Sequence, residues 1–314
     1  MKIVLLDAQT LGEVDLSLLE QWGEFLSYPI TSDSELYDRI KDAQILITNK
    51  TQLRAEILQR CPNLKLIAVT ATGTDIIDVE CAKKLGIEVK NVADYSTKSV
   101  AQHTLTLALD LLLRTRYYDD YCKSGSWSNS SIFTHVGKGL RQMDGKEWGI
   151  IGLGSIGKEV ARIAQCFGAK ISYASVSKQP QKDCPYAYKD LEDLLSSSDI
   201  ISIHAPLSDK SKNLLNSQNL CKIRDGSILI NVGRGGIVNE ADIAKELLER
   251  ELYFGADVLA SEPMKKDHPF LNPALHAKMI LTPHIAWAYE HSRKILVQKV
   301  LENIQEFLAR QAKQ

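Results

Sequence analysis

The sequence lacks the Cys-x-x-Cys spacing of redox motifs and zinc sites, since none of its six cysteines stands at that distance from another. No secretory signal precedes them, so we expect reduced, mostly packed thiols, a cytoplasmic protein and no metal site. Long apolar runs are missing too. The most apolar stretch, "LTLALDLLL" at Leu105–Leu113, is interrupted by Asp110 and is much shorter than a bilayer span. The pattern therefore predicts no membrane segment.

An excess of either charge is also absent, since 38 lysines and arginines face 39 aspartates and glutamates. No basic run is long enough to track a phosphate backbone, so we expect no nucleic-acid partner. What the chain does have is length and apolar content: 314 residues, 44% of them hydrophobic, can form two domains with a core in each.

Short β-rich apolar runs alternate with segments of helical period, which is typical of parallel sheets covered by helices. The alternation occurs in two sets, one from "KIVLLDA" to "IEVKNVA" and one from "EWGIIGLG" to "MILTPHI". The sequence therefore predicts an α/β protein with two Rossmann-like or flavodoxin-like lobes.

Two long helical patterns mark the borders of these lobes. A leucine-rich pattern runs from about Ser96 to Arg116, and a second follows Trp287. The second pattern can return to the first lobe, with an apolar face made of Leu296, Val300, Ile304 and Leu308. We expect one lobe at residues 1–97 and 288–314 and the other at residues 98–287.

A glycine motif opens the second set. Gly152, Gly154 and Gly157 stand in G-x-G-x-x-G register between the strand pattern "EWGII" and a helical stripe. In this context the first glycine permits a tight turn, the second lets a pyrophosphate approach the backbone, and the third allows close packing of helix and strand. The backbone amides of Ser155 and Ile156 would meet the pyrophosphate at the positive end of the helix. The motif predicts dinucleotide binding.

The helical stripe behind the motif contains four apolar residues and ends at Gly168, a suitable C-terminal cap. These residues are Ile156, Val160, Ile163 and Phe167.

Ser175 stands at the end of the next strand, "KISYAS", where an acidic residue commonly binds the adenosine ribose hydroxyls of NAD. A serine does not strongly repel a 2′-phosphate, and Ser177 and Lys178 follow it. No arginine stands there to grip that phosphate, however. The cofactor is expected to be NAD, with NADP left open.

Three polar residues follow later strand patterns: Arg234 in "NVGRGGIV", Glu262 in "DVLASEP" and His284 in "TPHIAW". Each alone has an ordinary structural interpretation. Together they suit reduction of a 2-keto acid. An arginine can hold the carboxylate by two parallel hydrogen bonds, an imidazolium can protonate the developing alkoxide, and a carboxylate stabilises that imidazolium.

These segments resemble the D-2-hydroxyacid dehydrogenase family in their order: the glycine loop, "NVGRGGIVNE", "GADVLASEP" and "LTPHIAW". Within that family, "TATGTDIIDV", "NVADYSTKSVAQHTLTLAL" and "WSNSSIFTH" resemble the glycerate dehydrogenase, or hydroxypyruvate reductase, branch. The resemblance implies a substrate-binding first lobe, a dinucleotide-binding second lobe, an active site in the cleft between them and a homodimer formed through the second lobe.

The resemblance also assigns roles to residues. Arg234 would bind the substrate, Glu262 would pair with His284, and His284 would donate or accept the proton. Asp257 would hold the nicotinamide carboxamide. Further cofactor contacts would come from His204, Ala205, Pro206, Val232 and Gly233, and substrate contacts from Thr72, Gly73 and Thr74.

Hydroxypyruvate or glyoxylate is the expected substrate, with D-glycerate or glycolate as product. A formate dehydrogenase loses support, because that branch carries glutamine where Glu262 stands, and a long phosphoglycerate dehydrogenase would need a further domain. The alternative from another class is a dinucleotide-sensing binding protein or corepressor on the same fold. His103 and Trp127 are open between substrate contacts and structural residues.

Overall fold

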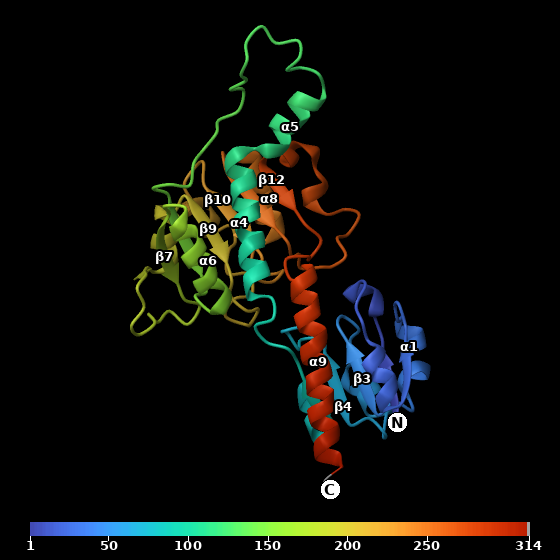
Figure 1. The fold of residues 1–314 in the computed structure, drawn as a ribbon. Coiled ribbons are helices and arrows are strands. Elements are labelled where there is room, and N and C mark those ends of the chain that lie inside the picture. Colours follow the sequence, from blue (N-terminus) through green and yellow to red (C-terminus); the bar gives the residue numbers. More distant parts are fainter. Residues whose placement is uncertain (313–314) are drawn as a thin grey trace. The chain divides into compact units, whose positions relative to one another are not determined.

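The computed structural model describes residues 1–312, which divide into two compact α/β units (Figure 1). The first unit comprises Met1–Ser96 and the C-terminal segment from Ala288, and the second comprises Thr97–Trp287. Each unit is built on a parallel sheet whose central strands are buried on both faces, as their continuous apolar runs require. The predicted fold class, two α/β lobes with parallel sheets, is confirmed.

The first unit has a sheet with the strand order β2-β1-β3-β4-β5, in which every pair is parallel. Its strands are β1 Lys2–Leu5, β2 Glu24–Ser27, β3 Ile45–Thr48, β4 Leu66–Val69 and β5 Glu88–Lys90. Its helices are α1 Asp33–Ile40, α2 Ala55–Leu58, α3 Val79–Lys84 and α9 Glu290–Gln311, with 3-10 turns η1 Ala8–Leu11 and η2 Ser17–Trp22.

Helix α9 packs against β4 within this unit. It buries Leu296, Val300 and Ile304, as the helical stripe predicts, and Phe307 rather than Leu308 completes the buried face.

The second unit has a sheet with the order β12-β11-β10-β9-β6-β7-β8, again parallel throughout. Its strands are β6 Glu147–Ile151, β7 Lys170–Ala174, β8 Ala187–Tyr188, β9 Ile200–Ile203, β10 Ile228–Asn231, β11 Tyr253–Ala256 and β12 Met279–Leu281. Its helices are α4 Thr97–Leu113, α5 Thr115–Lys123, α6 Ser155–Cys166, α7 Leu191–Ser197 and α8 Glu240–Glu249, with 3-10 turns η3 Leu220–Lys222, η4 Pro269–Leu271 and η5 Pro273–Lys278.

The strand order of the second unit reverses at β6. The chain adds β7 on one side of β6 and then crosses to β9 on the other, so the loops after β6 and β9 diverge at the carboxyl edge of the sheet. Ligands of open α/β sheets bind at such a switch point. The glycine motif occupies this place.

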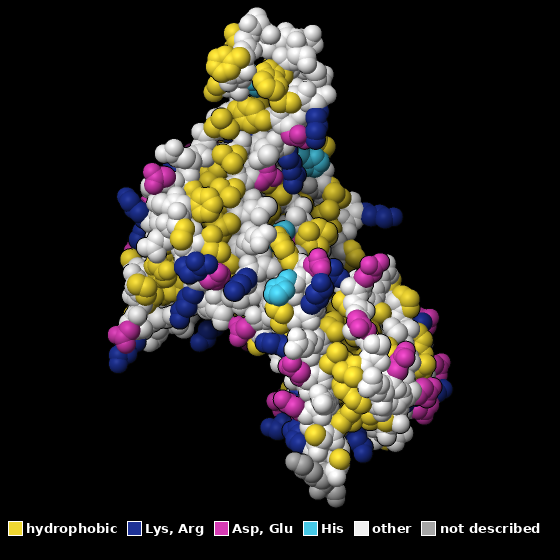
Figure 2. Space-filling view, viewed as in Figure 1, with side chains coloured by type: hydrophobic (Ala, Val, Ile, Leu, Met, Phe, Trp, Pro, Cys, Tyr) yellow, Lys and Arg dark blue, Asp and Glu magenta, His cyan; other side chains and the backbone are white. Residues whose placement is uncertain are grey.

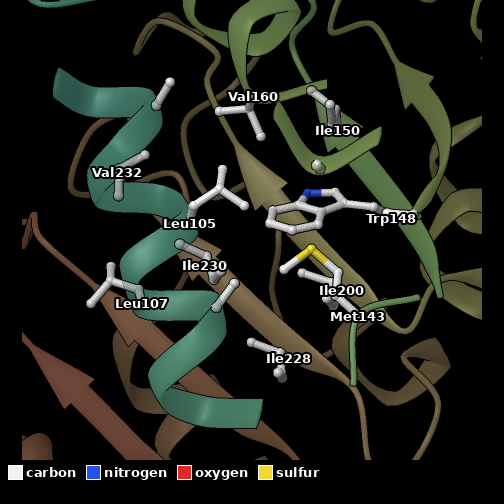
Figure 3. Packing of buried hydrophobic residues seen from close by; sticks show 14 of the residues in the cluster. Leu105, Leu107, Met143, Trp148, Ile150, Val160, Ile200, Ile228, Ile230 and Val232 are labelled. Carbon is white, nitrogen blue, oxygen red and sulfur yellow. The ribbon is translucent and has the colours of Figure 1, made fainter. Parts of the chain in front are cut away.

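One of the two hydrophobic cores of the second unit lies between the sheet and the helices α4 and α6 (Figure 3), and the other includes buried residues of α7 and α8. The fully buried indole of Trp148 on β6 faces Leu105 of α4, and Met143 and Ile200 lie close to it. The indole Nε1 donates a hydrogen bond to Ser202 Oγ at 2.9 Å, so this polar atom is satisfied inside the core. This packing fixes β6 against α4.

Three local expectations were wrong. The helix predicted to reach Arg116 ends at Leu113, because Arg114 is left-handed with φ 51° and α5 begins after it. Phe167 is 48% exposed, and α6 buries Ala161 and Ala164 instead. The cysteines are free thiols as expected, but they are not mostly packed: Cys61 is buried, whereas Cys122, Cys166 and Cys221 are exposed.

Candidate active site

The glycine loop connects β6 to α6, and two of its glycines are required by close packing. Gly152 is left-handed with φ 95°, and a Cβ there would lie 2.8 Å from Ala205 N. A Cβ on Gly157 would lie 2.3 Å from Gly152 O. Around Gly154, by contrast, a Cβ would meet no described atom within 4 Å. This open space is where a pyrophosphate would approach the backbone.

The N-terminus of α6 supplies the electrostatics for such a ligand. The amide of Lys158 donates to Gly154 O at 2.9 Å, so the amides of Ser155, Ile156 and Gly157 precede the first intrahelical bond. Those amides lie at the positive end of the helix dipole, which favours an anion. The loop therefore fits a dinucleotide.

The loops after β9 and β10 flank the glycine loop. His204 is the first residue after β9 and is followed by Ala205 and Pro206. Its amide donates a hydrogen bond to Ile151 O at 2.8 Å. A Cβ on Gly233, next to Val232, would lie 3.0 Å from Ala205 O. The expected cofactor contacts of these loops therefore lie side by side on neighbouring strands.

The ring of His204 is neutral. Its Nε2 lies 3.0 Å from Ser202 Oγ, which already accepts the hydrogen bond from the Trp148 indole. A neutral ring whose Nε2 carries no hydrogen can accept the Ser202 hydroxyl hydrogen at this nitrogen. Burial lowers the pKa of His204 to about 3.

The expected catalytic residues follow three adjacent strands. Arg234 follows β10, Glu262 follows β11 and His284 follows β12, and these strands neighbour one another in the sheet. The His284 Nδ1 and Glu262 Oε2 atoms are 2.7 Å apart, and the two side chains are 23% and 33% exposed. Glu262 Oε1 accepts the Leu259 amide at 3.0 Å, so the carboxylate is itself oriented. The ring is held through Nδ1, which leaves Nε2 for a reacting group.

A buried aspartate fixes the backbone that carries His284. Asp257 Oδ1 accepts hydrogen bonds from Thr282 Oγ1 at 2.6 Å and from the Ile285 amide at 2.8 Å, and its Oδ2 accepts from the Ala286 amide at 2.8 Å. His284 adopts φ 54°, and its amide donates to the backbone oxygen of Asp257 at 2.8 Å. His284, whose backbone is left-handed, is therefore held by hydrogen bonds at its own amide and at the amides of the next two residues. We did not expect this use of the Asp257 carboxylate from the sequence.

His103 is the residue of α4 that meets this loop. It is buried, and its Nε2 lies 2.9 Å from Thr282 Oγ1 and 3.6 Å from Asp257 Oδ1. Burial lowers the pKa of His103, and the Asp257 charge opposes that shift. Trp127 is half exposed, with its Nε1 donating to Phe133 O at 3.1 Å. Of the two open residues, His103 therefore lies beside the loop of His284.

The loop of Arg234 packs directly on the loop of Glu262. A Cβ on Gly235 would lie 1.9 Å from Leu259 O, so only glycine fits there. Asn231 Nδ2 donates to Arg234 O at 3.0 Å, and Glu240 Oε1 accepts the Ala260 amide at 2.6 Å. Asn231 and Glu240 were not singled out from the sequence. The only signal for them was their position in "NVGRGGIVNE".

The expected substrate contacts of the first unit follow β4. Thr72 Oγ1 donates to Val92 O at 3.1 Å, and Thr72 O accepts from Asn91 Nδ2 at 2.6 Å. Thr74 O accepts the Ile77 amide at 2.9 Å, which closes the turn Thr74–Ile77 directly after Gly73. These bonds flank the segment that carries the backbone amides of residues 72–74.

Residues 105–286 match the D-isomer specific 2-hydroxyacid dehydrogenase, NAD binding domain. The chain is 37% identical to a hydroxypyruvate reductase of Blautia hydrogenotrophica, over 98% of this chain and 97% of the relative. It is 34% identical to a glycerate dehydrogenase of Methylorubrum extorquens, over 98% and 96%. The chain belongs to the D-2-hydroxyacid dehydrogenase family. The resemblance of its sequence motifs is confirmed.

Two solved structures have a fold similar to that of this chain. A D-lactate dehydrogenase of Aquifex aeolicus, complexed with NAD and lactic acid, matches with a TM-score of 0.85 and 26% identity, covering 100% of this chain and 97% of that one. An acyclic imino acid reductase in complex with NADPH and D-arginine matches with a TM-score of 0.86 and 26% identity, covering 99% and 98%.

As a D-2-hydroxyacid dehydrogenase, the protein is an oxidoreductase that acts on 2-hydroxy acids with a nicotinamide dinucleotide, NAD(P), as cofactor. Within residues 1–312, no helix combines the length and the apolar character needed to span a bilayer.

Proposed function

We propose that this dehydrogenase reduces hydroxypyruvate to D-glycerate, and glyoxylate to glycolate as a second substrate. The hydrogen bond between His284 Nδ1 and Glu262 Oε2 carries the proposal, because it leaves an oriented imidazole Nε2 at the carboxyl edge of a dinucleotide-binding sheet. The names of the hydroxypyruvate reductase and glycerate dehydrogenase relatives support this choice among 2-keto acids.

The residues divide the work on the substrate. Arg234 binds the carboxylate through its planar fork and polarises the neighbouring carbonyl oxygen, and the backbone amides of residues 72–74 also bind the carboxylate. His284 donates a proton from Nε2 to that oxygen as it becomes an alkoxide, and Glu262 stabilises the positive ring and fixes its orientation. In the reverse direction, His284 accepts the hydroxyl proton.

The cofactor would be held by the glycine loop and its neighbours. Gly152, Gly154 and Gly157 with the amides of Ser155 and Ile156 bind the pyrophosphate, and Ser175 faces the adenosine ribose. The loops of His204–Pro206 and Val232–Gly233 line the remaining length, and Asp257 lies toward the nicotinamide carboxamide. When bound, the nicotinamide group supplies the hydride.

We further propose a homodimer formed through the second unit, in the cytoplasm. Helix α5 buries none of its residues, and the loop after it exposes Phe133 by 88% and Val136 by 76%. Figure 2 shows hydrophobic side chains gathered over this part of the molecule. Such exposure favours a second copy as its cover. The free cysteines agree with the proposed cytoplasmic location, because the cytoplasm is a reducing compartment. Sedimentation of a monomer would contradict the dimer.

The proposed activity is tested by initial rates with hydroxypyruvate, glyoxylate and pyruvate, each with NADH and with NADPH, followed by the loss of nicotinamide absorbance. We expect hydroxypyruvate to give the highest kcat/KM. His284→Gln, which removes the proton donor, should lower kcat by about 10²- to 10⁴-fold and leave dinucleotide affinity nearly unchanged.

Two results would contradict the proposal. A His284→Gln variant with nearly full activity would remove the proton role. A wild-type protein that binds the dinucleotide but turns over none of these acids would support the sensor interpretation instead.

A further inference from the structure

The turn after β7 lies beside the glycine loop. Ile151 of β6 pairs with Ala174 of β7, and Gly152 N donates to Ala174 O at 2.9 Å. Gly152 and Ser175 therefore leave the sheet side by side at its carboxyl edge. In a dinucleotide-binding unit this is the place of the adenosine ribose, whose 2′ position differs between NAD and NADP.

Two hydroxyl groups occupy that place in this chain. Ser175 Oγ and Ser177 Oγ are 2.6 Å apart, and the Ser177 amide donates to Ser175 Oγ at 3.2 Å. Ser175 is half buried and Ser177 is exposed. The first carboxylate along the chain after β7 is that of Asp183. The tip of β7 thus offers donors to an anion and no carboxylate of its own to repel one.

A lysine closes the same turn. The Lys178 amide donates to Ser175 O at 2.9 Å, and Lys178 is left-handed with φ 57°. Its side chain is exposed, and no ion pair among the described residues includes it. Lys170, at the other end of the same strand, pairs with Glu147 at 3.7 Å. The charge of Lys178 is therefore not neutralised by a protein carboxylate.

The segment that follows ties the turn to the glycine loop. Gln181 Nε2 donates to Leu153 O at 2.7 Å, and the Gln181 amide donates to the Tyr173 hydroxyl oxygen at 2.7 Å. Tyr173 is buried, so this anchor is fixed by the core. A turn held at both ends loses little conformational freedom when it binds a ligand.

We propose that Ser175, Ser177 and Lys178 form a binding site for the 2′-phosphate of NADP(H), so that the protein binds NADPH more tightly than NADH. The phosphate carries about two negative charges near neutral pH and accepts hydrogen bonds from the two hydroxyls and the ammonium group. The inference rests on the proposed function, because it concerns the adenosine end of the same dinucleotide.

Calorimetric titration of the full chain tests the proposal without turnover, using NADPH, NADH, 2′,5′-ADP and 5′-ADP as probes. We expect NADPH and 2′,5′-ADP to bind about tenfold or more tightly than their partners without the 2′-phosphate. Ser175→Asp should weaken NADPH binding by about tenfold or more and leave NADH binding equal or tighter, because a carboxylate repels the phosphate and accepts the ribose hydroxyls.

Lys178→Ala should weaken NADPH binding by about two- to fivefold and leave NADH unchanged, because the ion pair is solvent-exposed. Lys170→Ala is the matched control: it removes the same charge from the opposite end of β7 and should leave the NADPH to NADH ratio at the wild-type value. Thermal melting of each variant checks that it is folded.

Failure of this inference and failure of the proposed function would give different results. NADH bound as tightly as NADPH, with no change of the ratio in Ser175→Asp, would overturn this inference and leave the proposed function intact. No binding of either dinucleotide by the folded protein would overturn both.

Discussion

Two buried aspartates occupy similar places in the two units, and they hold loops that differ in chemistry. Asp7 follows β1 and accepts hydrogen bonds from the loop after the neighbouring strand β3, including the amides of Asn49, Lys50 and Thr51. Asp257 follows β11 and accepts them from the loop after its neighbour β12. In each unit, a carboxylate at the end of one parallel strand captures the donors that the next strand leaves unpaired.

The difference lies in what the captured loop carries. The loop of Asp7 contains amides and the hydroxyls of Thr48 and Thr51, all directed at the carboxylate. The loop of Asp257 contains His284, and the buried His103 borders it. The comparison indicates that the Asp7 cage serves the stability of the first unit, whereas the Asp257 cage also positions His284, the proposed proton donor.

Among tests of the two cages, the largest expected effect on turnover comes from Asp257→Asn. The amide group of asparagine would face donors at one of its two ends, so the loop should shift and move His284 from its productive position. We expect kcat to fall by about 10²-fold. Measurement of dinucleotide affinity separates two roles: unchanged affinity supports positioning of His284, whereas weakened affinity with normal kcat would support contact with the nicotinamide carboxamide.

Asp7→Asn should act on stability rather than on turnover. Urea unfolding is expected to show a loss of about 3 kcal/mol, because a buried acceptor of several charge-assisted hydrogen bonds is replaced by a group that can satisfy only some of them. The kcat of the folded variant should stay near the wild-type value. Asp38→Asn, an exposed carboxylate that pairs with Lys41 at 3.1 Å, is the control and should cost little. A kcat loss as large as that of Asp257→Asn would erase the distinction between the two cages.

The stability of the second unit is expected to depend on pH through His204. Burial lowers the pKa of His204 to about 3, whereas the unfolded chain titrates near 6.5. The unfolded state therefore binds the proton first, and the stability contributed by the neutral ring is complete above pH 6.5 and is lost as the pH falls toward 3. From this residue we expect a loss of about 2 kcal/mol between pH 7 and pH 5.

His204→Gln should remove that part of the loss, measured as the difference between urea unfolding at the two pH values. His276→Gln, at an exposed histidine, should keep the wild-type difference. An equal pH dependence in all three proteins would mean that the His204 ring is not enclosed in solution.

The fold could be predicted from the sequence where the signal is local. The central strands are continuous apolar runs, and G-x-G-x-x-G after such a run demands a tight turn with φ 95° at Gly152. Strand β2 was not predicted, because its short edge pattern, half-buried Phe25 and Leu26 between exposed Glu24 and Ser27, lacks a buried run. The break after α4 depends on a left-handed Arg114 that the sequence does not mark.

The site could be predicted residue by residue but not as an arrangement. Glu262 and His284 were expected as a pair from the family resemblance, and the structure joins them at 2.7 Å; their catalytic roles stay predictions. The cages of Asp7 and Asp257 could not be predicted, because each depends on which strands become neighbours and on backbone amides that carry no sequence signal. Long-range hydrogen bonds of this kind follow from the fold rather than from a motif.

The smallest expected effect concerns the negative charge beside the His284 ring and is measured in the pH profile of reduction. Glu262→Gln keeps an oxygen that can accept from Nδ1 but removes the negative charge. In the proposed mechanism reduction requires the protonated ring, so its rate falls as the pH rises. Without the carboxylate, the midpoint of the pH profile of reduction should move to lower pH, and this change should be small because the partly exposed pair is screened by solvent. Glu290→Gln removes an equal charge at an exposed position of α9 and should leave the midpoint in place. If both variants kept the wild-type profile, the charge of Glu262 would not govern protonation of the ring, and its part in the site would be limited to holding the orientation of Nδ1.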